Sequence, residues 1–409
     1  MLVQNEKVNL RNRIFNCLFL ISYILYIVQR YLHASALGES LDDNLKRSIK
    51  LIMLLLLGAA IRVKAKYRVK TIRKISITLV IGIVTSIFSQ DIDIICIVLF
   101  ICFSTYVDYR SLLKTYFWTN IILLGLIISL SRLGYIVDYT THHYSFIAHQ
   151  YNLVHAYGYF HYSTPSYIIL GLSLSLLYFY RNATTYIILG VVNLVSYAIF
   201  TTKLTFIVYV LFGIIYVFIS KTKINDNKHR RIRCFFEYLP LVLFLFNIVV
   251  AYGFRSDNAV MNLIDIAFGN RLSFSKAALH KIGLSLFGKS FNMAGIFSVN
   301  SNLLSYDSYF YIDNNYIYIM LRYGIVFTAL TIGIYVAISK IFLKVKDCFH
   351  ISWVVAMLFF AISNSCLINI EFNPMIFIGY KMIEDYYLNT RSFRLKYINR
   401  QMRYKYRKQ

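Results

Sequence analysis

The sequence is poor in the residues that mark disordered, fibrous and disulfide-bonded proteins. It has only three prolines and 17 glycines in 409 residues, too few for a proline-rich linker or a collagen-like repeat. Its six cysteines lie in or beside apolar runs and form no Cys-x-x-Cys pair. Neither a disulfide framework nor a zinc site is therefore indicated.

Charged residues are scarce as well. They make up only 15% of the chain, whereas 58% of residues are hydrophobic. A soluble chain needs more polar residues to cover its surface, so lipid must cover much of this one. The net charge of +25 would suggest a nucleic-acid partner in a soluble protein. In a membrane protein, however, Lys and Arg gather in cytoplasmic loops, so we expect no nucleic-acid partner.

Long apolar runs predict the fold class, which is all-α: a polytopic bundle of about twelve transmembrane helices, each needing roughly 17–25 largely apolar residues. The N-terminal run follows a basic start without a small-residue cleavage site, so we expect a retained first span. The candidate spans are Ile14–Tyr31, Ser48–Val63, Ile75–Ser89, Ile92–Val107, Tyr116–Tyr135, Pro165–Tyr180, Thr185–Phe200, Leu204–Ser220, Phe235–Tyr252, Asn315–Ser339, Ile351–Ile370 and, as the weakest, Phe372–Leu388.

Positive charge falls in every second loop, as in Arg62–Lys74 and Lys221–Arg233, and again in the tail at residues 390–409. The intervening loops are poor in Lys and Arg or carry acids. Cytoplasmic loops are the ones that collect Lys and Arg. The pattern predicts one integral membrane domain, residues 1–409, with both termini and the basic tail in the cytoplasm and an even number of spans.

Two predicted outer loops are long, residues 137–164 and 253–314. Functional residues favour loops held by a rigid scaffold, so we expect chemistry on this face. From Arg271 to Leu286 the apolar residues recur at helical spacing, which predicts a short amphipathic helix on the outer surface, entered at Arg271 and ending near Gly283 or Gly288.

The second loop is locally basic, although outer loops are normally poor in such charge. From residue 255 to residue 289 it carries two Asp and five basic residues: Arg255, Arg271, Lys276, Lys281 and Lys289. One interpretation is an anionic ligand such as the diphosphate of a lipid headgroup, since arginine binds phosphate bidentately. The other is a surface helix resting on anionic lipid.

Arg322 lies about two turns inside the next predicted span. An ionisable group at that depth faces a polar cavity or pairs with a partner. Asp313 is the candidate partner, and snorkelling of Arg322 to the interface is the alternative.

The first loop contains five histidines, His142, His143, His149, His155 and His161, without the spacing of a metal site. We expect no metal. A base or a hydrogen-bond donor for a sugar hydroxyl suits histidine, which titrates near neutral pH; ordinary polar loop residues are the alternative. No Walker loop, dinucleotide fingerprint or nucleophile elbow is present, so no nucleotide cofactor is expected.

Short motifs in and directly after the two loops are similar to those of a known family. They are Asn270-Arg271-Leu272 with Leu286-Phe287-Gly288, Asp313-Asn314-Asn315-Tyr316 leading to Arg322-Tyr323-Gly324-Ile325, and Gly158-Tyr159-Phe160-His161. With these motifs and its two enlarged outer loops, the chain resembles the Wzy-type polysaccharide polymerases of bacteria, relatives of the O-antigen ligases. Where that family often has Pro-Asn after the histidine, this chain has Tyr162-Ser163.

The resemblance implies glycosyl transfer at the outer face of the bacterial plasma membrane, building O-antigen, capsule or exopolysaccharide. A growing glycan on undecaprenyl diphosphate would move onto the non-reducing end of a new lipid-linked repeat unit. The leaving diphosphate needs charge stabilisation. The implied partners are this lipid-linked oligosaccharide, membrane lipid, a flippase and a chain-length regulator.

The resemblance also implies roles for single residues. Arg271 would stabilise the leaving diphosphate, and His161 or His155 would be the base. The further substrate contacts would be Arg255, Lys276, Lys281, Arg322 and Asp313, the last also a weaker candidate for the base. The rival function is a flippase for lipid-linked oligosaccharides, which usually shows internal halves and charges at mid-membrane; no convincing internal repeat is present.

Overall fold

The computed structural model describes residues 2–64, 69–145, 150–222, 229–267, 270–293 and 310–388. The predicted basic tail at residues 390–409 therefore lies outside the described residues, and so do residues 294–309 of the second predicted outer loop. The described chain falls into two compact units.

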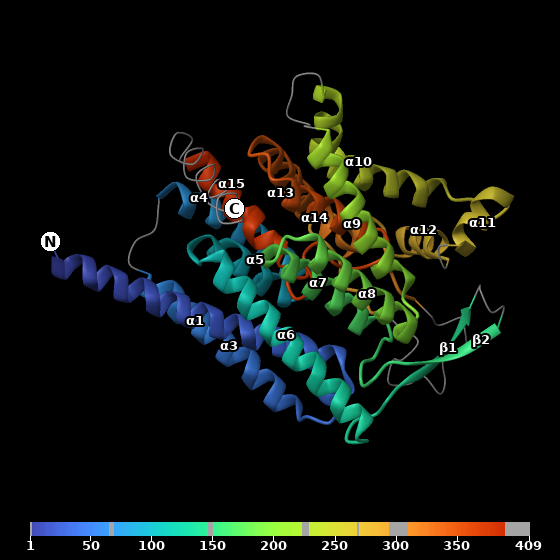
Figure 1. Cartoon of the computed structure of the whole chain (residues 1–409), viewed down its shortest axis with the longest axis horizontal. Coiled ribbons are helices and arrows are strands. Elements are labelled where there is room, and N and C mark those ends of the chain that lie inside the picture. The colour runs from blue at the N-terminus through green and yellow to red at the C-terminus, as the bar shows by residue number, and fades with distance from the viewer. Residues whose placement is uncertain are drawn as a thin grey trace. The chain divides into compact units, whose positions relative to one another are not determined.

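The first unit contains described residues 2–64, 69–72, 106–145 and 150–210. Within it α1, α3 and α6 run alongside one another, and α7 packs on α6 and α8 (Figure 1). Its elements are α1 (Leu2–Ala34), α2 (Ala36–Glu39), α3 (Asp43–Val63), α6 (Tyr109–Arg132), β1 (Thr140–Ser145), β2 (Gln150–His155), α7 (Thr164–Phe179), α8 (Ala183–Phe200) and the first part of α9 (Lys203–Lys221).

The second unit contains described residues 73–105, 211–222, 229–267, 270–293 and 310–388. Its longest helix, α13, packs against α10, α12, α14 and α15 (Figure 1). Its elements are most of α4 (Val69–Ser89), α5 (Asp93–Phe103), most of the short helix η1 (Ser104–Tyr106), the rest of α9, α10 (Arg230–Gly253), α11 (Ala259–Ala267), α12 (Arg271–Ile282), α13 (Asn315–Lys344), α14 (Cys348–Phe360) and α15 (Met375–Leu388).

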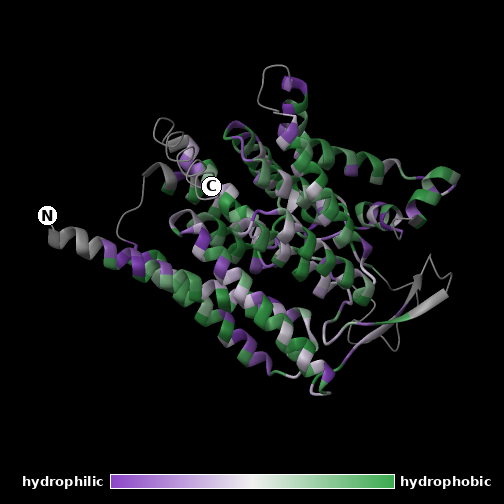
Figure 2. Cartoon of the chain, viewed as in Figure 1, coloured by the Kyte–Doolittle hydropathy of each residue, from purple (hydrophilic) through white to green (hydrophobic). Residues whose placement is uncertain are grey.

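Helix α8 shows the inverted polarity of a membrane helix. Its polar residues Asn193 and Ser196 are buried, whereas Ile187 and Val191 are 64% and 54% exposed. The Asn193 amide donates a hydrogen bond of 2.8 Å to Ser173 Oγ on α7. Figure 2 shows that hydrophobic residues predominate along the described helices. In water such an apolar face would be costly, so lipid must cover it.

Six described helices are long and apolar enough to cross a membrane: α1 from Asn9, α6, α8, α9, α10 and α13. Four predicted spans correspond to shorter apolar helices, Ile75–Ser89, Asp93–Tyr106, Thr164–Phe179 and Cys348–Phe360. The chain is therefore a helical, multi-pass membrane protein. The predicted span Ile351–Ile370 is wrong in its second half, because α14 ends at Phe360 and the buried residues after it are not helical.

The two long loops that are predicted to lie outside contain structure that the sequence did not predict. In the first, β1 pairs antiparallel with β2, and Thr140 lies opposite His155. The all-α prediction missed this hairpin. In the second, α11 precedes the predicted amphipathic helix.

Lysine placed on the lipid-facing side of α8 should prevent membrane integration. For Val191→Lys, at the middle of the helix, we expect a cost of about 3 kcal/mol for burying the charge in hydrocarbon and a clear loss of carbonate-resistant protein. Thr184→Lys, in the first turn, is the matched control and should integrate normally. Normal integration of the Val191→Lys protein would contradict the assignment of this face to lipid.

Candidate functional site

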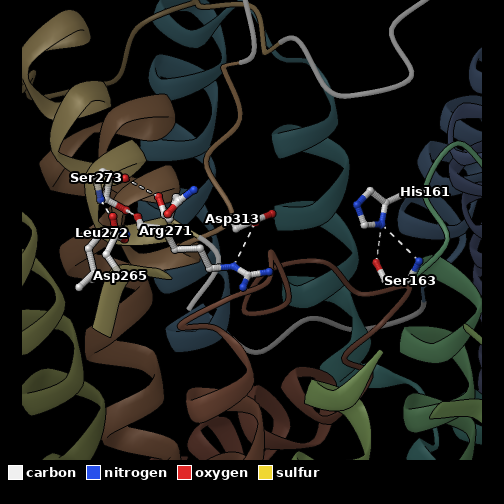
Figure 3. A network of polar contacts seen from close by, with 9 residues as sticks. His161, Ser163, Asp265, Arg271, Leu272, Ser273 and Asp313 are labelled. Carbon is white, nitrogen blue, oxygen red and sulfur yellow. Dashed lines mark hydrogen bonds and ion pairs between the residues drawn. The ribbon is translucent and has the colours of Figure 1, made fainter. Parts of the chain in front are cut away.

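Helix α12 begins at Arg271, as its apolar spacing predicts, and is fixed there by a buried acid. Asp265 Oδ1 accepts hydrogen bonds from the backbone N–H groups of Leu272 (2.8 Å) and Ser273 (3.3 Å) (Figure 3). A carboxylate at a helix N-terminus satisfies free N–H groups and complements the helix dipole. Asn270 turns the chain into the helix with a left-handed φ of 61°. Asp265, absent from the predicted site, thus sets the position of Arg271.

The Arg271 side chain pairs with Asp313. Its Nε lies 3.0 Å from Asp313 Oδ2 (Figure 3), and the two side chains are 31% and 32% exposed. Both groups are therefore within reach of a ligand. The prediction that Asp313 pairs with Arg322 is wrong, because the carboxylate is turned to Arg271 instead.

Arg322 is two turns inside α13, as predicted, and has no carboxylate partner among the described residues. Its Nη1 donates to the Phe291 carbonyl at 2.8 Å, and its guanidinium carbon is 5.4 Å from the Phe291 ring centroid. Its Nε is buried without a hydrogen-bond partner. Within the described ranges, the positive charge of Arg322 thus contacts a carbonyl dipole and an aromatic ring and no anion.

The other basic residues of the loop are also held by neutral groups. Lys276 Nζ donates to the Phe254 carbonyl at 2.7 Å, and Lys281 Nζ lies 4.7 Å from the ring centroid of Phe310. Arg255 is exposed. Carbonyl groups and rings orient these cations without cancelling their charge, so this part of the loop stays electropositive.

The apolar side of α12 packs on protein. Ala278 and Leu279 are buried in one core with Ala251 of α10 and Ile317 and Leu321 of α13. The expected amphipathic helix is therefore present, but its apolar face is already covered. This packing argues against the alternative in which α12 merely rests on lipid, and it places the basic residues on a fixed support.

Two of the motifs meet through a pair of glycines. Gly324 has φ 83° and interrupts α13, so the N–H groups of Ile325 and Val326 donate instead to the carbonyls of Ser285 (3.0 Å) and Leu286 (3.1 Å). A Cβ on Gly324 would lie 2.3 Å from the backbone nitrogen of Gly288. This crossing, which only glycine allows, holds residues 285–288 of the second loop beside Arg322.

The Asp313-Asn314-Asn315-Tyr316 motif anchors the start of α13. Asn314 Oδ1 accepts the backbone N–H of Tyr316 at 3.1 Å, and its Nδ2 donates to Asn247 Oδ1 of α10 at 2.7 Å. Asn315 Oδ1 accepts the N–H of Leu367 at 2.9 Å. Asp313 directly precedes this anchor, which keeps its carboxylate in place for Arg271.

The two candidate bases belong to the first unit and have different partners. His155 Nδ1 lies 2.7 Å from Asp138 Oδ2. His161 Nδ1 lies 2.5 Å from Ser163 Oγ and accepts the Ser163 backbone N–H at 3.2 Å (Figure 3). Asp138 was not among the predicted site residues, although it is the single acid of residues 137–164.

The Gly158-Tyr159-Phe160-His161 motif is anchored in the first unit by the buried side chain of Tyr159. Tyr159 is fully buried, and this burial raises the pKa of its phenol, which therefore stays neutral. Its ring packs edge-on against Tyr31 of α1 at 6.2 Å between centroids. Tyr159 thus fixes the chain just before His161.

No group of three metal-ligating side chains lies together in the described ranges; His149 lies outside them. No protein-family model, curated protein or solved structure matches the chain. The function proposed below therefore rests on the residues of this chain alone.

Alanine at Gly324 should destabilise the protein, because its Cβ would require a left-handed φ and would collide with Gly288. We expect a loss of about 2 kcal/mol or more, measured as a lower thermal unfolding midpoint in detergent. Gly333→Ala on the same helix is the control, since a Cβ there meets open space, and it should be neutral or stabilising. Equal midpoints for the two variants would show that the crossing does not constrain the fold.

Proposed function

We propose that this chain is a polysaccharide polymerase of the bacterial plasma membrane. It transfers a growing glycan from undecaprenyl diphosphate onto a lipid-linked repeat unit at the outer face. The observation that carries the proposal is the electropositive character of the second loop and of the adjoining start of α13. Their cations Lys276, Lys281 and Arg322 contact carbonyls and rings among the described residues. A diphosphate would supply anionic charge to these groups.

The proposed topology has twelve spans with both termini in the cytoplasm. The basic loops at residues 62–74 and 221–233 support it, because cytoplasmic loops collect Lys and Arg. In this arrangement α15 at Met375–Leu388 is the last span. The loops that carry Arg271 and His155 then face outward.

Arg271 acts on the leaving group in this proposal. As the bond between the anomeric carbon and the diphosphate oxygen breaks, its electron pair leaves with the diphosphate, and the guanidinium stabilises the added charge. Asp313, 3.0 Å from Nε, orients the guanidinium plane. The acceptor hydroxyl loses its proton to a histidine and bonds to the anomeric carbon. A flippase would supply the lipid-linked units and a chain-length regulator would limit the product.

A lipid-linked oligosaccharide flippase is the second candidate. Arg322, two turns inside α13 with a buried Nε that has no hydrogen-bond partner, favours it, because transporters place ionisable groups within their spans. The two functions differ in what accumulates without the protein. Lipid-linked units remain on the cytoplasmic leaflet when a flippase is missing and reach the outer leaflet when a polymerase is missing.

Arg271→Ala should leave single repeat units on the cell surface. In a strain that lacks the protein, re-expression of the wild type should restore long polysaccharide, and the variant should lower the amount roughly 100-fold. The measurement is the size distribution of surface polysaccharide at matched protein levels. Full-length polymer from the Arg271→Ala protein would overturn the role of Arg271.

A charge exchange separates chemistry from structure. Arg271→Asp combined with Asp313→Arg keeps an ion pair at the start of α12 but moves the guanidinium, so it should fold normally and remain inactive. Lys289→Ala is the matched control: the Lys289 side chain is exposed and its Nζ donates to the Ile282 carbonyl at 2.6 Å, so its removal should leave long polymer. Activity restored by the exchange would assign the pair a purely structural role.

A further inference from the structure

His161 is held in the wrong tautomer for a base. A backbone N–H can only donate, so the contact from the Ser163 N–H at 3.2 Å requires an unprotonated Nδ1 on His161. The proton of the neutral ring is then on Nε2. The one lone pair of the ring is already engaged by Ser163, whose Oγ lies 2.5 Å from the same nitrogen.

His155 is held in the opposite tautomer. The carboxylate of Asp138 can only accept, so the contact of 2.7 Å to His155 Nδ1 places the proton on Nδ1. The lone pair of the neutral ring is then on Nε2. The His155 side chain is 41% exposed and that of Asp138 only 23%, so the ring is open to a substrate while the acid behind it is more covered.

Asp138 is itself held in place. Its second oxygen, Oδ1, accepts the backbone N–H of Tyr157 at 2.7 Å. Tyr157 is in the left-handed region with φ 51°, and the Arg132 guanidinium lies 4.5 Å from its ring centroid. Both carboxylate oxygens therefore have defined donors, and among the described residues Asp138 contacts the imidazole directly while the Tyr157 ring lies 5.8 Å from it between centroids.

The segment after His155 is fastened to helices of the same unit. The Gly158 carbonyl accepts the N–H of Ala36 at 2.9 Å. A Cβ on Gly158 would lie 2.8 Å from Ile136 Cδ1 and 3.0 Å from Ser131 Cβ, so the backbone passes directly over the end of α6. A histidine carried by such a fixed segment is preorganised for proton transfer.

We infer that His155 is the base of the transfer reaction and that Asp138 is its positioning residue. His155 Nε2 takes the proton of the acceptor hydroxyl while the acceptor oxygen bonds to the anomeric carbon. The bond from that carbon to the diphosphate breaks, and the electron pair leaves with the diphosphate. Asp138 keeps Nε2 available and stabilises the imidazolium that forms. This inference rests on the proposed function.

Polymerisation by the purified full-length protein in lipid vesicles, with a lipid-linked repeat unit as substrate, tests the inference. His155→Gln should lower kcat about 100-fold or more with little change in KM. Asp138→Asn should also lower kcat with little change in KM, because the imidazole loses the acceptor that keeps its proton on Nδ1. A purely structural role of Asp138 would instead lower the amount of folded protein and leave kcat per folded molecule unchanged. His142→Gln, on the exposed part of β1, is the matched control and should keep the wild-type rate.

Selective ¹⁵N labelling of the histidines gives a readout that does not depend on activity. The His155 signal, identified by its loss in His155→Gln, should show an Nδ1 proton in the wild type and lose that preference in Asp138→Asn. An Nε2 proton on wild-type His155 would overturn the inference even where a variant fails to fold.

The outcomes also separate this inference from the proposed function. A wild-type protein that forms no polymer in vesicles and restores none in cells contradicts the function itself. If the wild type is active, polymer formation depends on Arg271, and His155→Gln retains full activity, then only the assignment of His155 as the base is overturned. Loss of activity in His161→Gln with retention in His155→Gln reverses it.

Discussion

Polar groups on membrane helices must find their partners inside the protein, because hydrocarbon offers none. Two buried amides on the described helices illustrate this constraint. Asn193 of α8 bonds Ser173 of α7, and Asn247 of α10 bonds Asn314 at the start of α13. These contacts are short and buried, whereas large apolar side chains on the same helices are exposed. The amides therefore decide which faces meet, and lipid takes the apolar faces that remain.

The same constraint explains how the second loop acquires a defined place. When Gly324 interrupts α13, the backbone groups freed there need new partners. The carbonyls of Ser285 and Leu286 supply them, so a loop segment becomes part of the helix packing. Arg322 lies two residues before the break and is held beside this segment. The hydrogen bonds that satisfy the backbone after Gly324 thus also fix the position of Arg322.

The sequence predicts the parts of this protein that depend on local pattern. Apolar runs located the long helices, and apolar spacing placed Arg271 at the entrance of α12. Local patterns do not predict ion pairs between residues that are distant in the sequence. Arg271 and Asp313 are 42 residues apart, and whether Asp313 pairs with Arg271 or with Arg322 depends on the course of the chain between them. Hydropathy also cannot distinguish a buried non-helical segment from a helix. For this reason the predicted span Ile351–Ile370 extends past Phe360, where α14 ends.

The histidines show why a site needs structure even when its residues are found. His155 and His161 are the same residue type in one loop, and histidine is a residue type that commonly transfers protons. What separates them is the neighbour of Nδ1, which is a donor from two residues away for His161 and an acceptor from 17 residues away for His155. A donor occupies the lone pair and an acceptor leaves the opposite nitrogen available. The chemistry that each ring offers is thus determined by its partner, and the partner of His155 is set by the hairpin that returns the chain to Asp138.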